Sequence, residues 1–366
     1  MIGYNFAQIN LDTLAANYRR VCEYSKGTQV ICVVKADAYG HGAVKCVSRL
    51  YKEGCRFFAV SCVAEALEIK PYVSESEILI LGVVPGDCAE VLIENNIITA
   101  LASLEEAKLL SQNIPQGKKL RVHIKLDTGM NRIGFEPDKK GIDEILTAYS
   151  MDKFDICGMF THFALADTPD KIDYTNMQFD KFMCVKSALE GKEMTLKTCH
   201  VCNSAGTMLH LSMHLDGCRA GIILYGLDPS PDARANGLKP VMTLKTHIVH
   251  TQTLKKGESV GYGATFTAEK DMQISTLPIG YADGFIRAYK DYDGISVNGT
   301  NCKIVGRICM DQCMIDTTGL SVEIGDEVIL FGGDSTAEDL SRCASSIPYE
   351  TVCLVSKRVP RVYIGE

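Results

Sequence analysis

The sequence predicts an α/β protein that combines an N-terminal (β/α)8 barrel of the TIM type with a mainly β C-terminal domain. Over the first two thirds of the chain, eight short apolar runs alternate with segments of helical apolar spacing, which is typical of parallel strands joined by helices. From about residue 239 onward, short alternating stretches are separated by glycine-containing turns, which is typical of antiparallel sheets. The chain has 366 residues, whereas one barrel typically uses about 250. Two domains are therefore expected.

The first elements are a strand at residues 4–10 and a helix at residues 11–24. We expect residues 1–10 to join the C-terminal domain. The eight barrel strands are expected at residues 30–35, 57–62, 78–82, 97–101, 122–127, 156–162, 199–204 and 221–226. Several of these runs are apolar throughout, as strands covered on both faces are. Helices are expected between them, for example at residues 42–54, 103–114 and 176–191.

The two domains are expected to span residues 1–238 and 239–366. The second part contains strand-like stretches such as residues 244–254, 295–310 and 326–333. A single helix-like piece, residues 337–346, interrupts them. This pattern favours a β domain with one helix.

Composition excludes several classes of partner. Charged residues make up 23% of the chain and the net charge is −7, without a basic stripe, so nucleic acid is not expected as a partner. No apolar run approaches the about 20 residues that a membrane span needs. The first residues lack the basic start and apolar core of a signal peptide, which favours a cytoplasmic protein.

Sixteen cysteines are scattered along the chain, mostly inside apolar runs. In a reducing compartment such cysteines are usually small core residues. The pairs Cys199/Cys202 and Cys309/Cys313 suggest a metal site, but a second pair at zinc-site spacing is lacking nearby. No metal is therefore expected.

Polar and cationic residues gather at the expected C-terminal ends of the barrel strands, where barrel enzymes place their sites. The set contains no acidic pair suited to glycoside chemistry, and no GxGxxG turn marks a dinucleotide site. The residues are Lys35, Lys125 with Asp127 and Arg132, His162, Asn203 with Ser204, and Arg219 with Gly221.

Lys35 ends the apolar run VICVVK. A lysine in that place either extends into solvent or presents an amine for covalent work, and lysine forms Schiff bases with carbonyl cofactors. The turns NSAG (203–206) and AGI (220–222) supply a serine hydroxyl and backbone N–H groups suited to phosphate. A lysine beside a phosphate site at a barrel mouth predicts pyridoxal 5′-phosphate (PLP) as cofactor.

Eight blocks stand in a fixed order along the chain: VVKADAYGHG, KLDTGMNRIG, MFTHFALAD, CNSAG, RAGIILYG, VGYGATFTA, PIGYADG and VGRICMDQCM. With these blocks in this order, the chain resembles the alanine racemase family over nearly its whole length. Asp37 and Cys202 depart from the common asparagine and alanine, and neither carries the chemistry. The resemblance implies the barrel, the β domain and PLP.

The resemblance assigns catalytic roles to four residues. Lys35 holds PLP and acts as a base on one face of the reacting carbon, and Tyr262 is the base on the other face. A phenol has a pKa near 10, so its anion must be stabilised, and the implied relay runs from Arg219 through His162 to Tyr262. Arg219 faces the pyridine nitrogen, which stays unprotonated because a guanidinium cannot accept a hydrogen bond.

The remaining contacts are also implied by the resemblance. The cofactor is held by Lys35, Tyr39, Arg132, Asn203, Ser204, Arg219, Gly221, Ile222 and Tyr349. The substrate is bound by Arg132, Tyr281, Met310 and Asp311. Lys125 is expected to be carbamylated and to hold Arg132 in place. The β domain of one subunit completes the barrel site of the other, so a homodimer with shared sites is implied.

The implied activity is the interconversion of L-alanine and D-alanine by two bases, which supplies D-alanine for peptidoglycan. A PLP decarboxylase would carry a glycine-triplet phosphate loop and an acidic partner for the ring nitrogen. A non-catalytic PLP-binding protein would be a single barrel. A serine racemase of the same fold is the nearest alternative, and Tyr349 favours alanine, although one hydroxyl is weakly discriminated by an apolar pocket.

Overall fold

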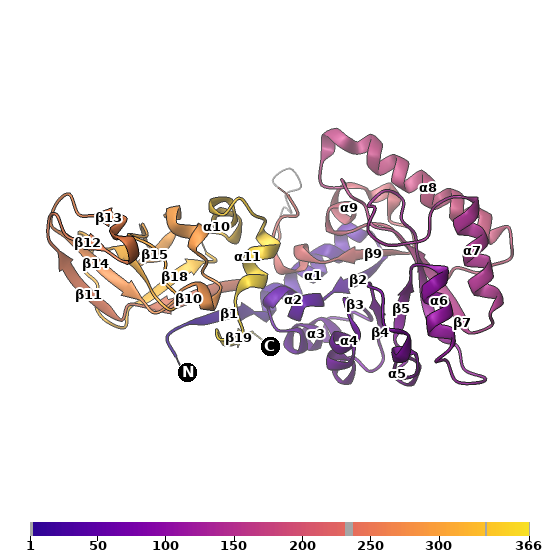
Figure 1. Cartoon of the computed structure of the whole chain (residues 1–366). Helices are drawn as coiled ribbons and strands as arrows, with labels where there is room; N and C mark the ends of the chain where they lie inside the picture. The colour runs from indigo at the N-terminus through magenta and orange to yellow at the C-terminus, as the bar shows by residue number, and fades with distance from the viewer. Residues whose placement is uncertain (1–2, 231–236, 334, 366) are drawn as a thin grey trace.

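The computed structural model describes residues 3–230, 237–333 and 335–365. Eight parallel strands form one sheet in the order β8-β7-β6-β5-β4-β3-β2-β9, shown in the right half of Figure 1. Backbone hydrogen bonds from Asp216 N to Cys199 O and from Arg219 N to Cys202 O, each 3.0 Å, link the chain next to β8 and β9. The sheet is therefore a nearly closed barrel. The strands are β2 (Gln29–Val33), β3 (Phe57–Val60), β4 (Glu77–Ile80), β5 (Ile98–Leu101), β6 (Leu120–Lys125), β7 (Phe154–Phe160), β8 (Thr198–His200) and β9 (Gly217–Ala220).

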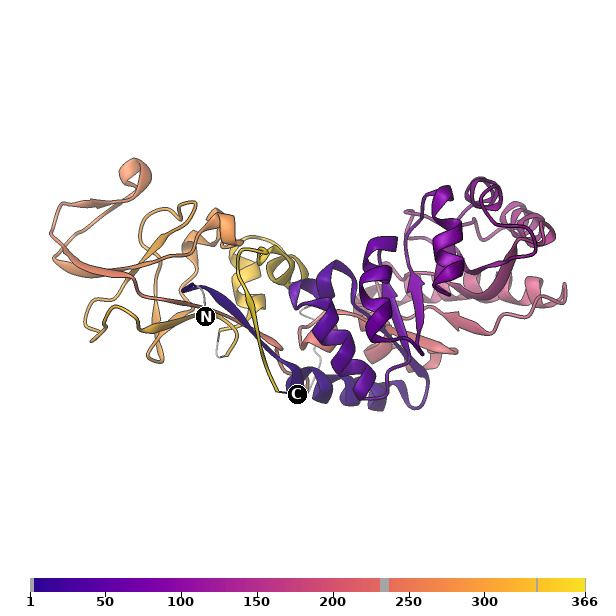
Figure 2. The same ribbon diagram turned by 90° about the horizontal axis from the view of Figure 1, so that it is seen from below.

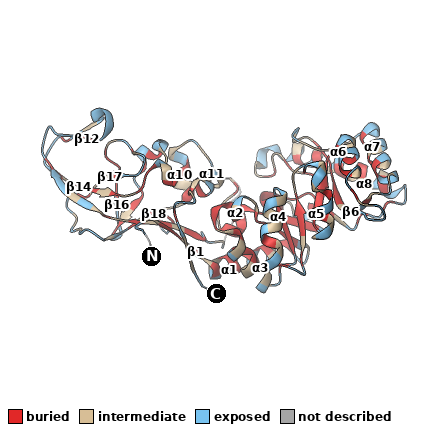
Figure 3. Cartoon of the chain, turned by 60° about the horizontal axis from the view of Figure 1, so that its bottom comes forward, coloured by how far each residue is buried: buried red, intermediate tan, exposed pale blue. Residues whose placement is uncertain are grey.

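Helices surround the barrel, and helices such as α3 bury one face against it. In α3, the residues Ala43, Cys46, Val47 and Leu50 are buried at helical spacing, and Figure 3 shows buried strands inside helices whose outer faces are exposed. The expected helices at 11–24, 42–54, 103–114 and 176–191 are confirmed. The barrel helices are α1 (Leu11–Ser25), α3 (Ala43–Lys52), α4 (Val63–Ile69), α5 (Ala89–Glu94), α6 (Leu104–Ser111), α7 (Lys139–Ser150), α8 (Ile172–Glu190) and α9 (Ser204–Leu209).

The expected strand at residues 221–226 is wrong. The eighth strand is β9, which ends at Ala220 opposite Cys32 of β2, and residues 222–225 form a short 3-10 helix, η5 (Ile222–Tyr225). All four side chains of η5 are buried. An apolar run is buried in either conformation, so its composition does not distinguish strand from helix. The strand ends where its partner β2 ends, at the mouth of the barrel.

A left-handed turn follows β2. The segment α2 (Lys35–Gly40) holds Ala36, Asp37, Ala38 and Tyr39 at φ between 52° and 55°. This conformation costs roughly 1–2 kcal/mol per residue outside glycine, so it must be held by its surroundings. Oδ1 of Asp37 accepts a hydrogen bond from Ala43 N at 2.6 Å, and Glu65 accepts one from Ala36 N at 2.7 Å. The turn keeps both Lys35 and Tyr39 at the barrel mouth.

The β domain contains three sheets. A six-stranded sheet has the order β16-β15-β18-β10-β1-β19, a three-stranded sheet has the order β11-β14-β17, and β12 pairs with β13. Strand β1 lies between β10, to which it is antiparallel, and β19, to which it is parallel, and Figure 2 shows β1 and β19 side by side. The strands are β1 (Phe6–Asn10), β10 (Met242–His247), β11 (His250–Leu254), β12 (Ser259–Val260), β13 (Phe266–Thr267), β14 (Met272–Leu277), β15 (Ile295–Val297), β16 (Thr300–Cys302), β17 (Cys313–Asp316), β18 (Glu327–Phe331) and β19 (Arg361–Ile364).

The β domain carries two α-helices where one was expected. The helix α10 (Ala337–Cys343) lies in the expected piece, and α11 (Pro348–Leu354) follows it. Pro348 occupies the first turn of α11, which is the favoured place for proline in a helix. Helix α11 packs against α2 so closely that a Cβ on Gly40 would lie 2.4 Å from Val352 O. Short 3-10 helices complete the chain: η1 (Lys70–Tyr72), η2 (Gly86–Cys88), η3 (Pro169–Lys171), η4 (Leu211–Met213), η6 (Tyr262–Ala264), η7 (Tyr281–Asp283) and η8 (Arg287–Asp291).

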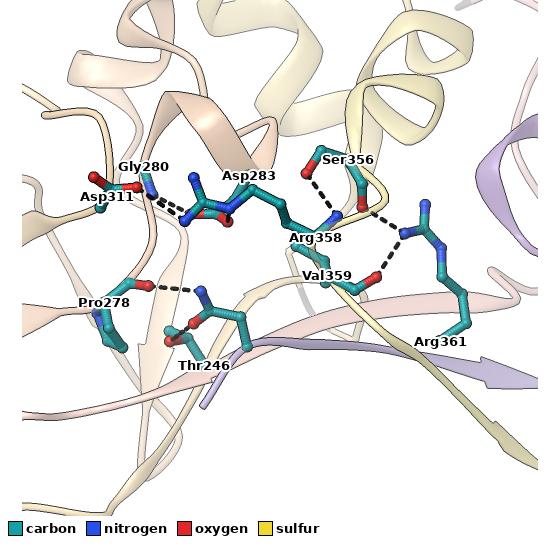
Figure 4. A network of polar contacts seen from close by, with 10 residues as sticks. Thr246, Pro278, Gly280, Asp283, Asp311, Ser356, Arg358, Val359 and Arg361 are labelled. Carbon is teal, nitrogen blue, oxygen red and sulfur yellow. Dashed lines mark hydrogen bonds and ion pairs between the residues drawn. The ribbon is translucent and has the colours of Figure 1, made fainter. Parts of the chain in front are cut away.

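Polar contacts tie the segment after α11 to both halves of the molecule, and Figure 4 shows those of Arg358 with Asp283 and Asp311. Nε of Arg361 donates to Gly40 O at 2.9 Å, and its Nη1 donates to Ser356 O at 2.6 Å. Arg358 forms ion pairs with Asp283 at 3.3 Å and with Asp311 at 2.9 Å. Within the described residues, no helix combines the length and apolar composition needed to cross a bilayer.

Candidate active site

A cavity of about 190 Å³ opens at the C-terminal ends of the barrel strands. It lies where barrel enzymes place their chemistry, and it brings together ten of the residues expected from the sequence. Val33, Leu81 and Phe160 add apolar walls that the sequence did not single out. The expected residues that line it are Lys35, Tyr39, Lys125, Arg132, His162, Asn203, Ser204, Arg219, Gly221 and Tyr349.

Lys35 enters the cavity directly after β2. Burial lowers the pKa of its amine, and the nearby charges of Arg132 and Arg219 lower it further, whereas Glu65 raises it. A lowered pKa increases the fraction of neutral amine, which is the nucleophilic form. Lys35 is therefore suited to covalent bonding with a carbonyl group.

One end of the cavity is lined by hydrogen-bond donors. Gly221 N donates to Oγ of Ser204 at 3.0 Å, and the rings of Tyr39 and Tyr349 lie 6.1 Å apart. Burial raises the pKa of both phenols, so both keep their protons and can donate to an anion. A Cβ on Gly221 would lie 2.6 Å from Oη of Tyr39, so glycine is required for the space at this end.

Asn203 lines the same end of the cavity, whereas Ile222 lies behind the cavity wall. Oδ1 of Asn203 accepts from Gly206 N at 3.0 Å and so caps α9. Ile222 is fully buried as the first residue of η5 and does not line the cavity.

Arg219 is buried on β9 and is held from several sides. Its Nη1 donates to Nδ1 of His200 at 2.8 Å, and its Nη2 donates to Thr161 O at 2.7 Å and Val201 O at 3.0 Å. Burial lowers the pKa of Arg219 to about 10, so it remains a cation at neutral pH. These contacts use Nη1 and Nη2, and among the described residues Nε–H of Arg219 has no hydrogen-bond partner, while Arg219 lines the cavity.

His200 and His123 continue this chain into the barrel, and sequence reasoning missed both. Nε2 of His200 lies 3.0 Å from Nδ1 of His123. Because a guanidinium can only donate, Nδ1 of His200 accepts from Arg219 and the proton of His200 lies on Nε2. Burial lowers the pKa of His123 to about 3 and that of His200 well below its usual value. The sequence could have identified both residues, because each histidine stands inside an otherwise apolar strand.

Gly158 makes room for this histidine pair. A Cβ at Gly158 would lie 2.5 Å from Nε2 of His123. The interior of the barrel is therefore shaped around a polar chain that ends at Arg219, rather than filled with aliphatic side chains alone.

Lys125 and Asp127 shape the loop that carries Arg132. Nζ of Lys125 donates to Leu126 O at 2.6 Å and to Ile133 O at 3.0 Å, and burial lowers its pKa to about 8. The carboxylate of Asp127 accepts hydrogen bonds from the backbone N–H groups of Gly129, Asn131 and Arg132. These bonds close the loop and place Arg132 at the exposed mouth of the cavity.

Four of the expected site residues lie outside the cavity, on the β domain. Tyr262 on η6 is 73% exposed, Met310 is 52% exposed, and Tyr281 on η7 is 42% exposed; Asp311 is exposed and pairs with Arg358 (Figure 4). None of the four lines the cavity. Tyr281 N donates to Cys309 O at 3.1 Å, so Tyr281, Met310 and Asp311 form a second group on the β domain.

The expected relay is only partly assembled within one chain. Nη2 of Arg219 lies 3.5 Å from Nδ1 of His162. Burial, and then the charges of Arg219 and Arg132, lower the pKa of His162 well below its usual value, so its imidazole is neutral. The relay ends there, because Tyr262 lies on the β domain outside the cavity.

Comparison with known proteins covers both domains. Residues 9–229 match the alanine racemase N-terminal domain, and residues 241–363 match the alanine racemase C-terminal domain. The curated alanine racemase of Clostridium tetani is 43% identical over 370 residues, which cover 99% of this chain and 95% of that protein.

Solved structures agree with this match over the full length. The alanine racemase of Clostridium difficile 630 superposes with a TM-score of 0.95 at 38% identity and covers 100% of this chain and 96% of its own. The alanine racemase of Bacillus anthracis, solved with bound L-Ala-P, superposes with a TM-score of 0.94 at 29% identity and covers the same shares.

Proposed function

The chain belongs to the alanine racemase family, and we propose that PLP held at Lys35 and a second copy of the chain complete its active site. The chain is an amino-acid racemase, an isomerase that interconverts L-alanine and D-alanine. One observation supports the proposal. Lys35, Arg219 and a group of hydrogen-bond donors suited to a phosphate line the same cavity. The mechanism of this chain follows from what each of these groups can do.

The cavity fits PLP by its donor set. Ser204, Gly221, Tyr39 and Tyr349 would hold the phosphate, and Lys35 would hold the carbonyl carbon. PLP, when bound, supplies the electron-withdrawing group that makes the α-proton of an amino acid removable. Asn203 and Ile222 would support the phosphate end through the start of α9 and of η5.

Arg219 sets the protonation of the ring nitrogen it would face. A guanidinium can only donate, and in the described part of the chain the hydrogen-bond partners of Arg219 are carbonyl oxygens and neutral histidines. A carboxylate, which other PLP enzymes place at the ring nitrogen, would keep that nitrogen protonated. Arg219 therefore favours proton exchange over reactions that need a strong electron sink.

Racemisation requires a proton to leave one face of the α-carbon and to return on the other. Lys35, with its lowered pKa, would serve one face. The opposite face needs a second base, and we assign it to the partner subunit's Tyr262. Tyr262 is exposed in the single chain and lies on the β domain, so a homodimer that places it at the partner cavity accounts for both features.

His162 would stabilise the anion of that phenol. Nδ1 of His162 faces Nη2 of Arg219, and since the guanidinium donates, the proton of the neutral imidazole lies on Nε2. Nε2–H can then donate to the phenolate oxygen of the partner subunit's Tyr262. The same dimer would bring the partner subunit's Tyr281, Met310 and Asp311 to the substrate, opposite Arg132.

We assign a carbamate to Lys125. A neutral amine and CO2 form a carbamate by a new N–C bond and lose one proton, and burial lowers the pKa of Lys125 to about 8, which supplies neutral amine near neutral pH. The carbamate anion would hold the cation of Arg132, whereas an unmodified ammonium would repel it. This assignment explains why a lysine is buried beside two arginines.

We place the enzyme in the cytoplasm, where it would supply D-alanine for peptidoglycan. All sixteen cysteines are free thiols, as is usual in a reducing compartment. We also propose that the two domains span residues 1–238 and 239–366. It is supported by the two family matches, which end at 229 and begin again at 241.

Three measurements test the proposed site. Protein loaded with PLP should show a visible absorption band, and L-alanine should lose its circular dichroism signal as it racemises. Borohydride reduction followed by peptide mapping should place the pyridoxyl group on Lys35. A pyridoxyl group on another lysine would contradict the assignment, and L-serine racemised as fast as L-alanine would favour the serine racemase alternative.

A further inference from the structure

Two cysteines and a histidine that could bind a metal ion, Cys202, His214 and Cys218, lie close together outside the lining of the candidate active site. Cys202 follows β8, His214 follows η4, and Cys218 lies on β9. One side-chain ligand atom from each lies within 4.8 Å of the other two, and all three residues are buried. His214 and Cys218 are four residues apart, whereas Cys202 follows another strand, so the fold brings Cys202 to the other two.

The arrangement differs from the cysteine pairs that the sequence suggested. Cys199 lies three residues before Cys202 and is also buried, but it is outside the group. Cys202 is drawn to His214 and Cys218 instead, because Arg219 N donates to Cys202 O and thereby holds the chain after β8 against β9. The group thus shares only Cys202 with the pair Cys199/Cys202, for which the sequence did not predict a metal.

We propose that Cys202, His214 and Cys218 form a binding site for a thiophilic d10 metal ion such as Zn²⁺, separate from the catalytic cavity. Two sulfurs and one imidazole nitrogen are typical zinc ligands, and a site with three protein ligands leaves the fourth position to water. Ligand atoms on one zinc ion lie roughly 3.3–3.8 Å apart by the usual bond lengths. Each pair of atoms therefore needs to approach by about 1.5 Å at most.

Charge and partners favour the ion at this place. Binding forms two metal–sulfur bonds and one metal–nitrogen bond and releases the two thiol protons, without electron transfer. A divalent ion with two thiolates and a neutral imidazole carries no net charge, so burial imposes little electrostatic cost. The imidazole of His214 also contacts the backbone carbonyl of Thr207 at 3.0 Å, and ligating histidines usually have such a carbonyl partner.

The site is joined to the catalytic groups through the chain. Cys202 directly precedes Asn203 and Ser204, and Cys218 directly precedes Arg219. A bound ion would cross-link the two ends of the nearly closed barrel sheet at this point. We therefore expect the ion to raise the melting temperature of the protein by linkage.

Cadmium titration of the reduced, PLP-loaded enzyme tests the proposal. Chelator-buffered Cd²⁺ should produce the ultraviolet charge-transfer band of cadmium thiolates, saturating at one ion per chain. Cys202→Ala and Cys218→Ala should each reduce the band by about half or abolish it, since each removes one of two thiolates. His214→Gln keeps both sulfurs, so the band should keep its intensity while more Cd²⁺ is needed to reach it.

Cys199→Ala is the matched control, because it removes a buried thiol from the same segment without touching the group. It should leave the cadmium band and the Zn²⁺-dependent rise in melting temperature unchanged. Melting curves without metal show whether each variant folds, and His214→Gln tests the site even where loss of a buried thiol prevents folding. The proposal fails if wild-type protein gives no band at equimolar buffered Cd²⁺, if the band keeps its full intensity in both Cys202→Ala and Cys218→Ala, or if His214→Gln reaches the band at the same Cd²⁺ concentration as the wild type.

Discussion

Nη1 of Arg219 donates to Nδ1 of His200 at 2.8 Å, and this bond fixes the hydrogen positions of the barrel interior. The proton of His200 is placed on Nε2, from where it is shared with Nδ1 of His123. Both imidazoles are neutral because burial lowers the pKa of each. The orientation of Arg219 therefore depends on a residue that does not line the cavity.

Two substitutions of His200 should separate its contacts. His200→Asn retains an acceptor near the position of Nδ1 and so retains the bond to Arg219, whereas His200→Gln retains a group near Nε2 and loses that bond. We expect kcat to fall about tenfold more in His200→Gln than in His200→Asn, which is about 1.4 kcal/mol. KM for alanine should change little in both, because His200 acts as a positioning residue.

Steady-state kinetics normalised to PLP content measure this difference. A purely structural role would reduce the fraction of PLP-loaded protein and leave the normalised kcat equal in the two variants. Equal normalised kcat values would therefore contradict the positioning role.

Gly221→Ala should weaken PLP binding. The added Cβ would lie 2.6 Å from Oη of Tyr39, which forces the tyrosine out of the phosphate end. We expect the Kd for PLP to rise at least about tenfold, or 1.4 kcal/mol, in a fluorescence titration of the apoenzyme. Gly191→Ala is the control, since its Cβ would meet only ordinary contacts, 3.4 Å from Ser187 O.

A double-mutant cycle with Tyr39→Phe identifies the cause. Removal of the Tyr39 hydroxyl relieves the close approach, so Gly221→Ala should cost less in the Tyr39→Phe background than in the wild type. Strict additivity of the two changes would show that the added methyl group acts by another route.

Carbamylation of Lys125 should increase with pH. The pKa of Lys125 is about 8, so the neutral amine makes up about a tenth of the population at pH 7 and about half at pH 8. With ¹³C-bicarbonate, a carbamate carbon signal should therefore grow from pH 7 to pH 8. The signal should be absent in Lys125→Arg, and a signal that persists there would assign the carbamate to another lysine.

Activity should return when two inactive variants share a dimer. Lys35→Ala lacks the covalent lysine and Tyr262→Ala lacks the opposing base, so each homodimer should be inactive. After random exchange of equal amounts, about half the dimers are mixed, and one site in each mixed dimer is intact. Roughly a quarter of wild-type activity per site is expected.

Circular dichroism of alanine measures the restored activity, and differently tagged subunits measure mixed dimers. If mixed dimers form without activity, Lys35 and Tyr262 do not meet across an interface. Cys199→Ala protein, which keeps both Lys35 and Tyr262, controls for the procedure when it is dissociated and reassociated by itself.

Much of the site could be predicted because strand ends are visible in a sequence. Lys35, His162 and Arg219 each end an apolar run or lie beside one, and the barrel brings all such ends to one rim. The family resemblance added Tyr349, whose helix α11 was not expected from the pattern. His123 and His200 were missed because a histidine inside an apolar run has no periodicity of its own.

Two features depend on tertiary context that local patterns do not carry. The run GIILYG is equally apolar as strand or 3-10 helix, and only the end of β2 decides where β9 stops. The grouping of Cys202 with Cys218 depends on how the barrel closes, since sixteen residues separate them in sequence. Sequence motifs for metal sites detect cysteines a few residues apart. They do not detect metal ligands that come from two different strands of a sheet.

The position of β1 between β10 and β19 affects how the molecule can be made. Strand β1 is synthesised before the barrel, but Phe6 pairs with Lys245 and Ala7 with Arg361, which leave the ribosome after the barrel. In sequence order, the barrel therefore lies between β1 and the two strands that pair with it. The barrel can fold while β1 is still unpaired. Strand β1 is short, and its last residue, Asn10, is the N-cap of α1. The first barrel helix can therefore hold β1 close to the barrel during translation.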